Sequence, residues 1–336
     1  MSQTVIVGVD IAKHVFHVHG SDETGRQVFS RRLRRSQVAA FFANLPPCLV
    51  GMEAGRASHH WARTIKRSGH DVKLMPPRYV KPYVKANKTD ALDAEAIAEA
   101  VTRPTMRFVA VKSENQQAAL MLHRLRQRFV RMRTAQANQA RGFMAEFGRP
   151  VPQGVHSVLQ HIEIIIAEED VPGDLKEALR EIADHVQQLS ERIDRLEGRI
   201  RRAQQADDVA SRLIEIPGVG PLTASAFAAS VEDAGSFQSA RRFASWLGLT
   251  PRQHSSGGKE KLLGISKRGD VYLRTLLIHG ARSLLRSNAS CPPALRAWTS
   301  GLNERRHANV ATVALANKMA RMIWAVMSKG ERYQMI

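Results

Sequence analysis

The chain has 336 residues, with 50 lysines and arginines against 31 aspartates and glutamates, so its formal net charge is +19 and its pI is near 10.7. This charge is spread along the whole chain, which favours nucleic acid over other acidic surfaces as the partner, because bound cations release counterions from phosphates. Two cysteines, Cys48 and Cys291, exclude a disulfide framework and a zinc finger, and no signal peptide or apolar run of transmembrane length is visible, so we expect a cytoplasmic protein without a membrane partner.

Residues 1–112 alternate between patterns typical of strands and of helices. Three β-branched or alternating runs come first, and helices and strands then follow one another. Strands are predicted at 4–9, 14–19, 27–33, 48–52 and 71–75, and helices at 37–44, 58–68 and 91–101. Three successive strands followed by alternating elements predict a mixed α/β sheet over residues 1–112.

Two long helices are predicted next, at 114–147 and 174–206. The second has a near-heptad apolar seam, so the two should form an antiparallel coiled-coil arm over residues 113–206 and favour self-association. In the first helix, apolar residues recur from Leu122 to Met132 at steps of three and four. Its other side is basic, without a carboxylate between Glu114 and Glu146. We take Arg124, Arg128 and Arg131 as candidate nucleic-acid contacts, with an ordinary solvated face as the alternative.

Residues 207–336 form a third segment, which is basic and predicted to be mainly helical, with helices at 222–230 and 311–327. The apolar stripe of the last helix indicates core packing. A glycine-containing turn precedes the helix at 222–230. Its residues Gly218 and Gly220 would let backbone N–H groups approach a phosphate at the start of that helix. A plain glycine turn between helices is the alternative.

Four carboxylates are candidate metal ligands. Asp10 and Glu53 end the predicted first and fourth strands, which lie side by side in a mixed sheet of the ribonuclease H type. Asp90 and Asp93 stand three residues apart at the start of a helix, so they share one face. Carboxylate oxygens suit Mg²⁺ or Mn²⁺, and such a site can polarise a phosphate. Taken singly, Asp90 and Asp93 could equally be helix-start acids.

A polar stretch at 253–259 is the second candidate site. Ser256 precedes a glycine and is surrounded by cations that could hold phosphates, namely Arg252, Lys259, Lys267 and Arg268. A serine there could attack phosphorus if its proton is removed. His254 could be the base or a simple DNA contact. The residues alone favour a phosphate-binding loop over a catalytic serine.

The chain resembles the insertion-sequence transposases of family one hundred and ten, and most closely their eleven-eleven subgroup. The resemblance covers nearly the whole chain and rests on the number and order of short motifs. These are residues 8–13, 52–54, 59–62, 88–94, 216–220, 246–251, 255–259, 263–270 and 314–320.

The resemblance implies a RuvC-like N-terminal domain with a DEDD metal tetrad, which falls on Asp10, Glu53, Asp90 and Asp93. It also implies a C-terminal transposase domain whose nucleophilic serine falls on Ser256, with Ser255 as the alternative since the serine is doubled. Members of the family are thought to join DNA through a phosphoserine intermediate. They use a structured bridge RNA that pairs with donor and target DNA, and they act as dimers or tetramers.

We therefore expect an Mg²⁺-dependent, RNA-guided enzyme that cuts and rejoins DNA. One alternative is a RuvC-like nuclease with water as its nucleophile, which leaves the serine-bearing C-terminal segment unexplained. Another is a non-enzymatic nucleic-acid-binding protein, in which replacing Asp10 would leave all activity intact.

Overall fold

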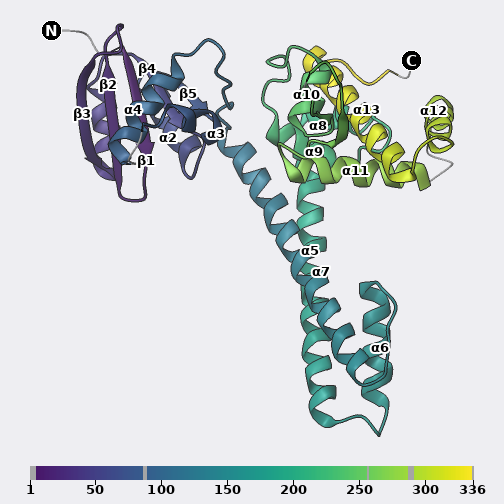
Figure 1. Cartoon of the computed structure of the whole chain (residues 1–336). Coiled ribbons are helices and arrows are strands. Elements are labelled where there is room, and N and C mark those ends of the chain that lie inside the picture. The colour runs from purple at the N-terminus through teal and green to yellow at the C-terminus, as the bar shows by residue number, and fades with distance from the viewer. Residues whose placement is uncertain (1–4, 86–88, 256, 287–290, 335–336) are drawn as a thin grey trace. The chain divides into compact units, whose positions relative to one another are not determined.

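A computed structural model of the chain describes residues 5–85, 89–255, 257–286 and 291–334. It contains two compact units, residues 1–113 (unit 1) and 114–336 (unit 2) (Figure 1). Each unit has its own clusters of buried hydrophobic residues. The division into three domains at 1–112, 113–206 and 207–336 stays a prediction.

Unit 1 contains a five-stranded mixed sheet in the order β3-β2-β1-β4-β5. Its strands are β1 (Ile6–Ile11), β2 (Val15–Ser21), β3 (Gln27–Arg34), β4 (Leu49–Glu53) and β5 (Asp71–Met75). The first three strands form an antiparallel meander, whereas β1, β4 and β5 run parallel. The prediction of a mixed α/β sheet is confirmed, and β1 lies beside β4 as expected.

Helices cover both faces of this sheet. They are η1 (Arg35–Gln37), α1 (Val38–Ala43), α2 (Ser58–Arg67), α3 (Pro77–Val80), η2 (Lys81–Tyr83) and α4 (Asp90–Val101). Alternate residues of a strand point to opposite faces, so Val7 and Val9 join the core that contains Phe42 of α1 and Trp61 of α2. The opposite face of β1 and β4 is covered by α4.

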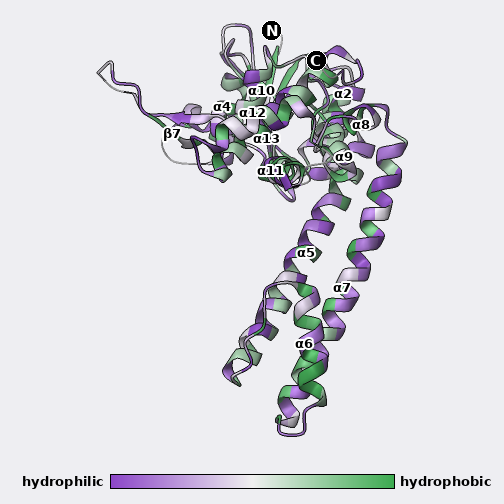
Figure 2. Cartoon of the chain, turned by 90° about the vertical axis from the view of Figure 1, so that its right-hand side faces the viewer, coloured by the Kyte–Doolittle hydropathy of each residue, from purple (hydrophilic) through white to green (hydrophobic). Residues whose placement is uncertain are grey.

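The long arm of unit 2 consists of α5 (Glu114–Glu146), α6 (Val155–Ala167) and α7 (Gly173–Gln205). The chain runs outward along α5 and returns along α7, which packs against it (Figure 1). In Figure 2, hydrophilic and hydrophobic segments alternate along α7, as expected for a helix whose seam is buried from Leu175 to Ile200. The two long helices were predicted, whereas α6 was not.

The predicted apolar side of α5 is not its buried side. The residues of α5 that are fully buried are His123, Ala137, Ala140 and Met144. Leu125, which belongs to the predicted stripe, is 43% exposed. Ala137, Ala140 and Met144 belong to an apolar cluster that also contains residues of α6 and α7, so tertiary packing rather than the local apolar stripe selects the buried side of α5.

The rest of unit 2 is a helical body with one small hairpin. Its helices are α8 (Asp208–Leu213), α9 (Pro221–Ser230), α10 (Ala240–Trp246), α11 (Val271–Arg286), α12 (Pro293–Asn303) and α13 (Ala308–Lys329), and its strands are β6 (Pro251–Gln253) and β7 (Leu262–Ile265). The mainly helical character of the C-terminal segment is confirmed. The hairpin differs from the expected loop without strands.

Helix α13 is the one helix of the described residues that is long and apolar enough to cross a membrane by length and composition. The expectation that no segment has this property is therefore wrong. Its apolar side, including Leu315, Met319 and Ile323, is fully buried in the largest core cluster of unit 2. It is thus a core helix of unit 2, as its stripe predicted.

Candidate functional site

The sheet of unit 1 places two predicted carboxylates on one face. Asp10 is the penultimate residue of β1, and Glu53 is the last residue of β4. Because Gly8 pairs with Gly51 in the parallel ladder and side chains alternate along a strand, Asp10 and Glu53 share the face that carries these two glycines. That is the face on which α4 lies.

Two glycines permit the close approach of α4. A Cβ atom on Gly8 would lie 2.0 Å from the carbonyl oxygen of Ala94, and one on Gly51 would lie 2.9 Å from Cβ of Val101. Any other residue at Gly8 would therefore push the helix off the sheet. This contact fixes the height of α4 above the strands that carry Asp10 and Glu53.

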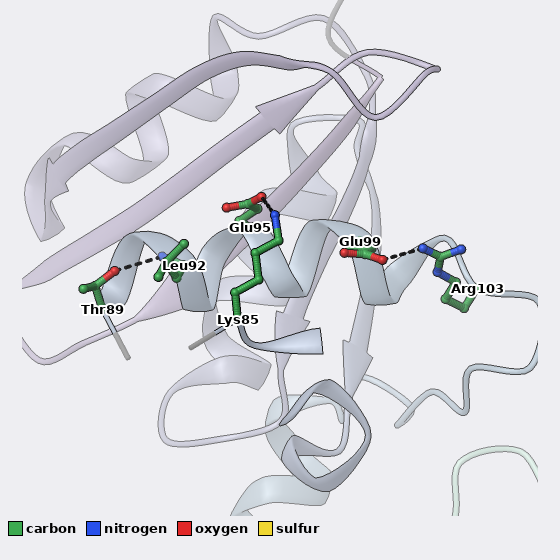
Figure 3. A network of polar contacts seen from close by, with 6 residues as sticks. All are labelled: Lys85, Thr89, Leu92, Glu95, Glu99 and Arg103. Carbon is green, nitrogen blue, oxygen red and sulfur yellow. Dashed lines mark hydrogen bonds and ion pairs between the residues drawn. The ribbon is translucent and has the colours of Figure 1, made fainter. Parts of the chain in front are cut away.

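The start of α4 is defined by a hydrogen-bonded cap. Oγ1 of Thr89 accepts a hydrogen bond from the backbone N–H of Leu92 at 3.3 Å. Figure 3 shows this cap together with the ion pairs of Glu95 with Lys85 and of Glu99 with Arg103. The acids farther along α4 are thus matched by cations, while Asp90 and Asp93 occupy its first turn.

Asp10 lies in the electrostatic field of the first turn of α4. Burial raises the pKa of the Asp10 carboxyl above its ordinary value, and the carboxylates of Asp90 and Asp93 raise it further. His17 and the backbone N–H of Ile11 act in the opposite direction. His17 stands opposite Asp10 in the β1–β2 register, and its Nε2 lies 3.6 Å from Oδ2 of Asp90.

The structure brings three of the four predicted ligands within electrostatic range of Asp10 or of its carboxylate neighbours, and the fourth lies at the end of the adjacent strand. Three of them, Asp10, Asp90 and Asp93, interact electrostatically, and Glu53 follows Met52, the partner of Val9 in the adjacent strand. Within the described ranges, no three histidine, cysteine, aspartate or glutamate side chains are arranged so that they could hold one metal ion. The donor chemistry nevertheless suits a hard cation, since Asp10 is partly desolvated and lies in the field of two further carboxylates.

The second candidate site lies on the β6–β7 hairpin. Gln253 of β6 pairs with Leu262 of β7, and the backbone N–H of His254 donates to the carbonyl of Lys261 at 2.9 Å. Ser255 is exposed at this position. Ser256, the predicted nucleophile, lies outside the described residues. The four predicted phosphate-binding cations are all exposed, namely Arg252, Lys259, Lys267 and Arg268.

A tight backbone crossing closes the base of the hairpin. Gly248 and Gly269 both have positive φ, and their Cβ atoms would lie 2.0 Å from the carbonyl oxygen of Arg268 and 1.8 Å from that of Trp246. Only glycine fits such a contact. Arg274 of α11 is buried below the crossing and donates from Nη1 to the carbonyls of Leu247, at 2.9 Å, and Arg268, at 3.0 Å.

The glycine turn before α9 has a packing explanation at one of its two positions. Gly218 has positive φ, and a Cβ there would lie 2.9 Å from Cε of Met319 and 3.2 Å from the carbonyl oxygen of Gly280. Gly220 differs, because it is the N-cap of α9 and open space surrounds its Cα. The turn thus combines a tight contact on α11 with an unobstructed helix start.

The arginines of α5 fall into two groups. Arg126 forms an ion pair with Glu197 of α7, and Arg133 donates to Oγ of Ser190 at 3.2 Å. The three that we expect to contact nucleic acid, Arg124, Arg128 and Arg131, are exposed and lie on one stripe of the helix. Their nucleic-acid role stays a prediction.

Several residues that shape these sites were not singled out in the sequence. His17 gave no signal, because it becomes a neighbour of Asp10 and Asp90 only through strand pairing. Gly8 and Gly51 did have a sequence signal, since each stands two residues before a predicted ligand. Arg274 gave none, because nothing local distinguishes a buried arginine from an exposed one.

Two family models match the chain. The model described as Transposase IS116/IS110/IS902 family covers residues 210–295 and contains the hairpin and α11. A second transposase model, of the DEDD type of IS110, covers residues 7–148 and contains all four carboxylates.

Individual proteins are similar over almost their whole length. A probable family 20 transposase from Pseudomonas aeruginosa is 50% identical, over 98% of both chains. The transposase of insertion sequence IS1111A from Coxiella burnetii is 43% identical, over 99% of this chain and 92% of its own. The transposase of insertion sequence IS1328 from Yersinia enterocolitica is 40% identical, over 98% of both. The chain therefore belongs to the IS110 family of insertion-sequence transposases, which are enzymes that cut and rejoin DNA.

Proposed function

We propose that this transposase joins DNA through a covalent serine intermediate formed on the β6–β7 hairpin, assisted by a divalent metal ion held by the carboxylates of a RuvC-like unit 1. One observation supports the proposal most strongly. Asp10 shares a partly desolvated sheet face with the first turn of α4, where Asp90 and Asp93 raise its pKa. Carboxylates crowded in this way gain free energy when a cation reduces their repulsion.

The ligands of the proposed ion are Asp10, Glu53, Asp90 and Asp93, all of which offer hard oxygen donors suited to Mg²⁺ or Mn²⁺. A bound ion there would supply charge stabilisation for a phosphate. The chain contributes a rigid sheet face below and a helix fixed at Gly8 and Gly51 above. A face fixed in this way would limit how far its donors move before an ion binds, which would lower the ordering cost of binding.

The chemical step assigned to the hairpin is a transesterification. Oγ of Ser256 attacks the scissile phosphorus, a phosphorus–oxygen bond to the 3′ oxygen breaks, and the serine proton is transferred overall to the released 3′ hydroxyl. One phosphodiester replaces another, so no energy-rich cofactor is needed. The cations that would hold the phosphates are Arg252, Lys259, Lys267 and Arg268. His254 is adjacent to the doubled serine and is the candidate base.

We further propose that the enzyme acts in the bacterial cytoplasm on donor and target DNA. A bridge RNA transcribed with the element would select the sites, and the enzyme would act as a homodimer or homotetramer. Support comes from the formal charge of +19 and from the exposed arginine stripe of α5, which both suit polyanionic partners.

The test is a covalent-trapping assay. Purified protein is mixed with Mg²⁺, the RNA transcribed from the flank of the element and labelled DNA that spans the junction, and the products are separated under denaturing conditions. We expect a protein-linked DNA band that is lost in Ser256→Ala and in Asp10→Asn. The matched control is Ser255→Ala, which should keep the band.

The outcomes separate the alternatives. If Ser255→Ala loses the band and Ser256→Ala keeps it, the nucleophile is the neighbouring serine. Cleaved DNA without linked protein in the parent chain would indicate a nuclease that uses water.

A further inference from the structure

The sixty residues before the C-terminal tail are strongly basic. From Val271 to Gly330 the chain has nine lysines and arginines and a single carboxylate, Glu304. This range covers α11, α12 and α13. This excess of positive charge is not required for folding, since these helices pack through apolar residues such as Leu277 and Leu315. It indicates a polyanionic ligand.

Two of these nine cations lie on one face of α11. His279, Arg282, Ser283 and Arg286 follow one another at helical spacing and line a hollow of about 410 Å³. The arginine Arg282 is half-buried, and the other three residues are exposed. Within the described part of the chain, neither arginine forms an ion pair with a carboxylate. We call these four residues the α11 basic face.

The opposite side of α11 explains why this face is fixed in space. Leu273, Leu277 and Ala281 are fully buried in the core of unit 2. Next to His279, Gly280 contacts the turn at Gly218 so closely that a Cβ there would lie 2.2 Å from its carbonyl oxygen. The helix therefore cannot rotate about its axis without disrupting the core, so its basic face has a fixed orientation within unit 2.

We infer that the α11 basic face binds the backbone phosphates of duplex DNA beside the site of strand exchange. Guanidinium groups bind phosphates through paired hydrogen bonds, and serine and histidine add further donors. From His279 to Arg286 the face is about 10 Å long. It therefore touches a few neighbouring phosphates and contributes affinity rather than sequence choice.

Two features favour duplex DNA over a single strand or a guide RNA. Single-stranded nucleic acid is usually held by aromatic side chains that stack on bases, and the α11 basic face has no Phe, Tyr or Trp. Helix α11 also begins six residues after the end of β7, so the hairpin and the face belong to one structural module. The inference rests on DNA as the substrate and not on the identity of the nucleophile.

The test measures affinity for a fluorescent DNA duplex over a series of salt concentrations. The variant Arg282→Gln/Arg286→Gln keeps helix-forming side chains and removes two cations. We expect affinity near physiological salt to fall roughly tenfold, and the slope of log Kd against log salt to decrease by about 2, since each lost phosphate contact removes about 0.9. The fold loss in affinity should be the same for a duplex of scrambled sequence, because the proposed contacts are to the phosphate backbone.

A matched control removes the same charge elsewhere. Arg192 and Arg195 are exposed on α7 beside the carboxylates of Glu191 and Asp194. Arg192→Gln/Arg195→Gln should bind duplex DNA like the parent. Ser256→Ala should do so too, which separates this inference from the proposed chemistry.

A second variant guards against loss of folding. Ser283→Glu changes one exposed residue and places a negative charge between the two arginines. We expect it to weaken duplex binding at least as much, with an unchanged melting temperature. The inference is overturned if both variants keep parental affinity, or if they weaken the binding of the flank RNA and leave duplex binding unchanged.

Discussion

At the scale of single residues, Arg274 holds the base of the β6–β7 hairpin, although the sequence did not single it out. Its guanidinium is buried and donates to two carbonyl groups at the base of the hairpin. Arg274→Ala would leave both carbonyls without this donor, at a cost of about 1–3 kcal/mol. We expect the covalent adduct to form much more slowly while duplex binding changes little.

The conservative variant distinguishes positioning from simple loss of stability. Arg274→Lys can donate to one of the two carbonyls, so part of the adduct rate should return. Adduct formation is measured in single-turnover reactions alongside thermal melting of each variant. Parental rates in Arg274→Ala would show that the hairpin base is held in place without this side chain.

Another residue-scale prediction concerns His123. Its ring is hydrogen-bonded to Tyr272 at 3.0 Å and to Ser225 at 3.2 Å, and burial lowers its pKa to about 4. The unfolded chain takes up this proton near pH 6.5, whereas the folded chain does not. Stability is therefore lost as the pH falls from about 6.5 towards about 4, by up to about 3 kcal/mol.

Urea unfolding at pH 7, 6 and 5, followed by intrinsic fluorescence, measures this effect. In His123→Asn, which does not titrate, the dependence of stability on pH should be shallower than in the parent by the same amount. Equal slopes in the two proteins would mean that His123 is protonated in the folded state or contributes nothing.

The contrast between Asp10 and His123 shows what can be predicted from sequence at this scale. Asp10 stands out because an acid close to the end of an apolar strand is unusual and because its neighbours in the fold follow from strand order. His123 does not, since its partners lie 102 and 149 positions away in the chain. Long-range partners of a buried polar group have no local sequence signal.

At the scale of elements, the contact between α4 and the sheet is the feature on which the carboxylate face depends. Gly8→Ala would place a methyl group 2.0 Å from the carbonyl oxygen of Ala94. We expect α4 to move away or unit 1 to lose stability, by about 1–3 kcal/mol or more. Gly55→Ala is the control, because open space surrounds that residue.

Thermal melting and Mn²⁺ titration of the two variants give independent readouts. Gly8→Ala should melt at a lower temperature and bind the ion more weakly, while Gly55→Ala should match the parent in both. An unchanged melting temperature in Gly8→Ala would show that α4 can adjust its position at little cost.

Elements were predictable where periodicity is long or the composition strongly apolar. The strands of unit 1 and helices α5 and α7 meet this condition. Helix α6 was missed although it is apolar, because it directly follows Pro150 and Pro152, which by themselves indicate only the end of the preceding helix. The β6–β7 hairpin was missed for another reason, since β6 has three residues, all exposed, and no apolar alternation. The apolar face of α5 was placed wrongly because tertiary packing selected its small residues.

At the scale of the whole molecule, we expect the two units to unfold independently, because the described residues of each unit form hydrophobic clusters of their own. Fluorescence can separate them. Unit 1 contains one tryptophan, Trp61, and unit 2 contains Trp246, Trp298 and Trp324. We expect Gly8→Ala to shift the transition of unit 1 and to leave that of unit 2 unchanged.

The measurement uses urea unfolding of a chain in which the three tryptophans of unit 2 are replaced by phenylalanine, compared with a chain that carries only Trp61→Phe. Two different midpoints are expected. Coincident transitions that shift together in Gly8→Ala would show that the units unfold cooperatively.

The crossing of the chain at Gly248 and Gly269 has a consequence for the diversity of this family. Between these glycines, Leu249 is buried in the core and Ile265 packs against it, and Arg274 holds the base of the segment. The part from Pro251 to Gly264 is different, because all of its described residues are exposed. Its length and composition can therefore change without repacking of the helices. Related elements can acquire new reach or new contacts by exchanging this segment alone, and a protein engineer can do the same by grafting one hairpin onto the body of another.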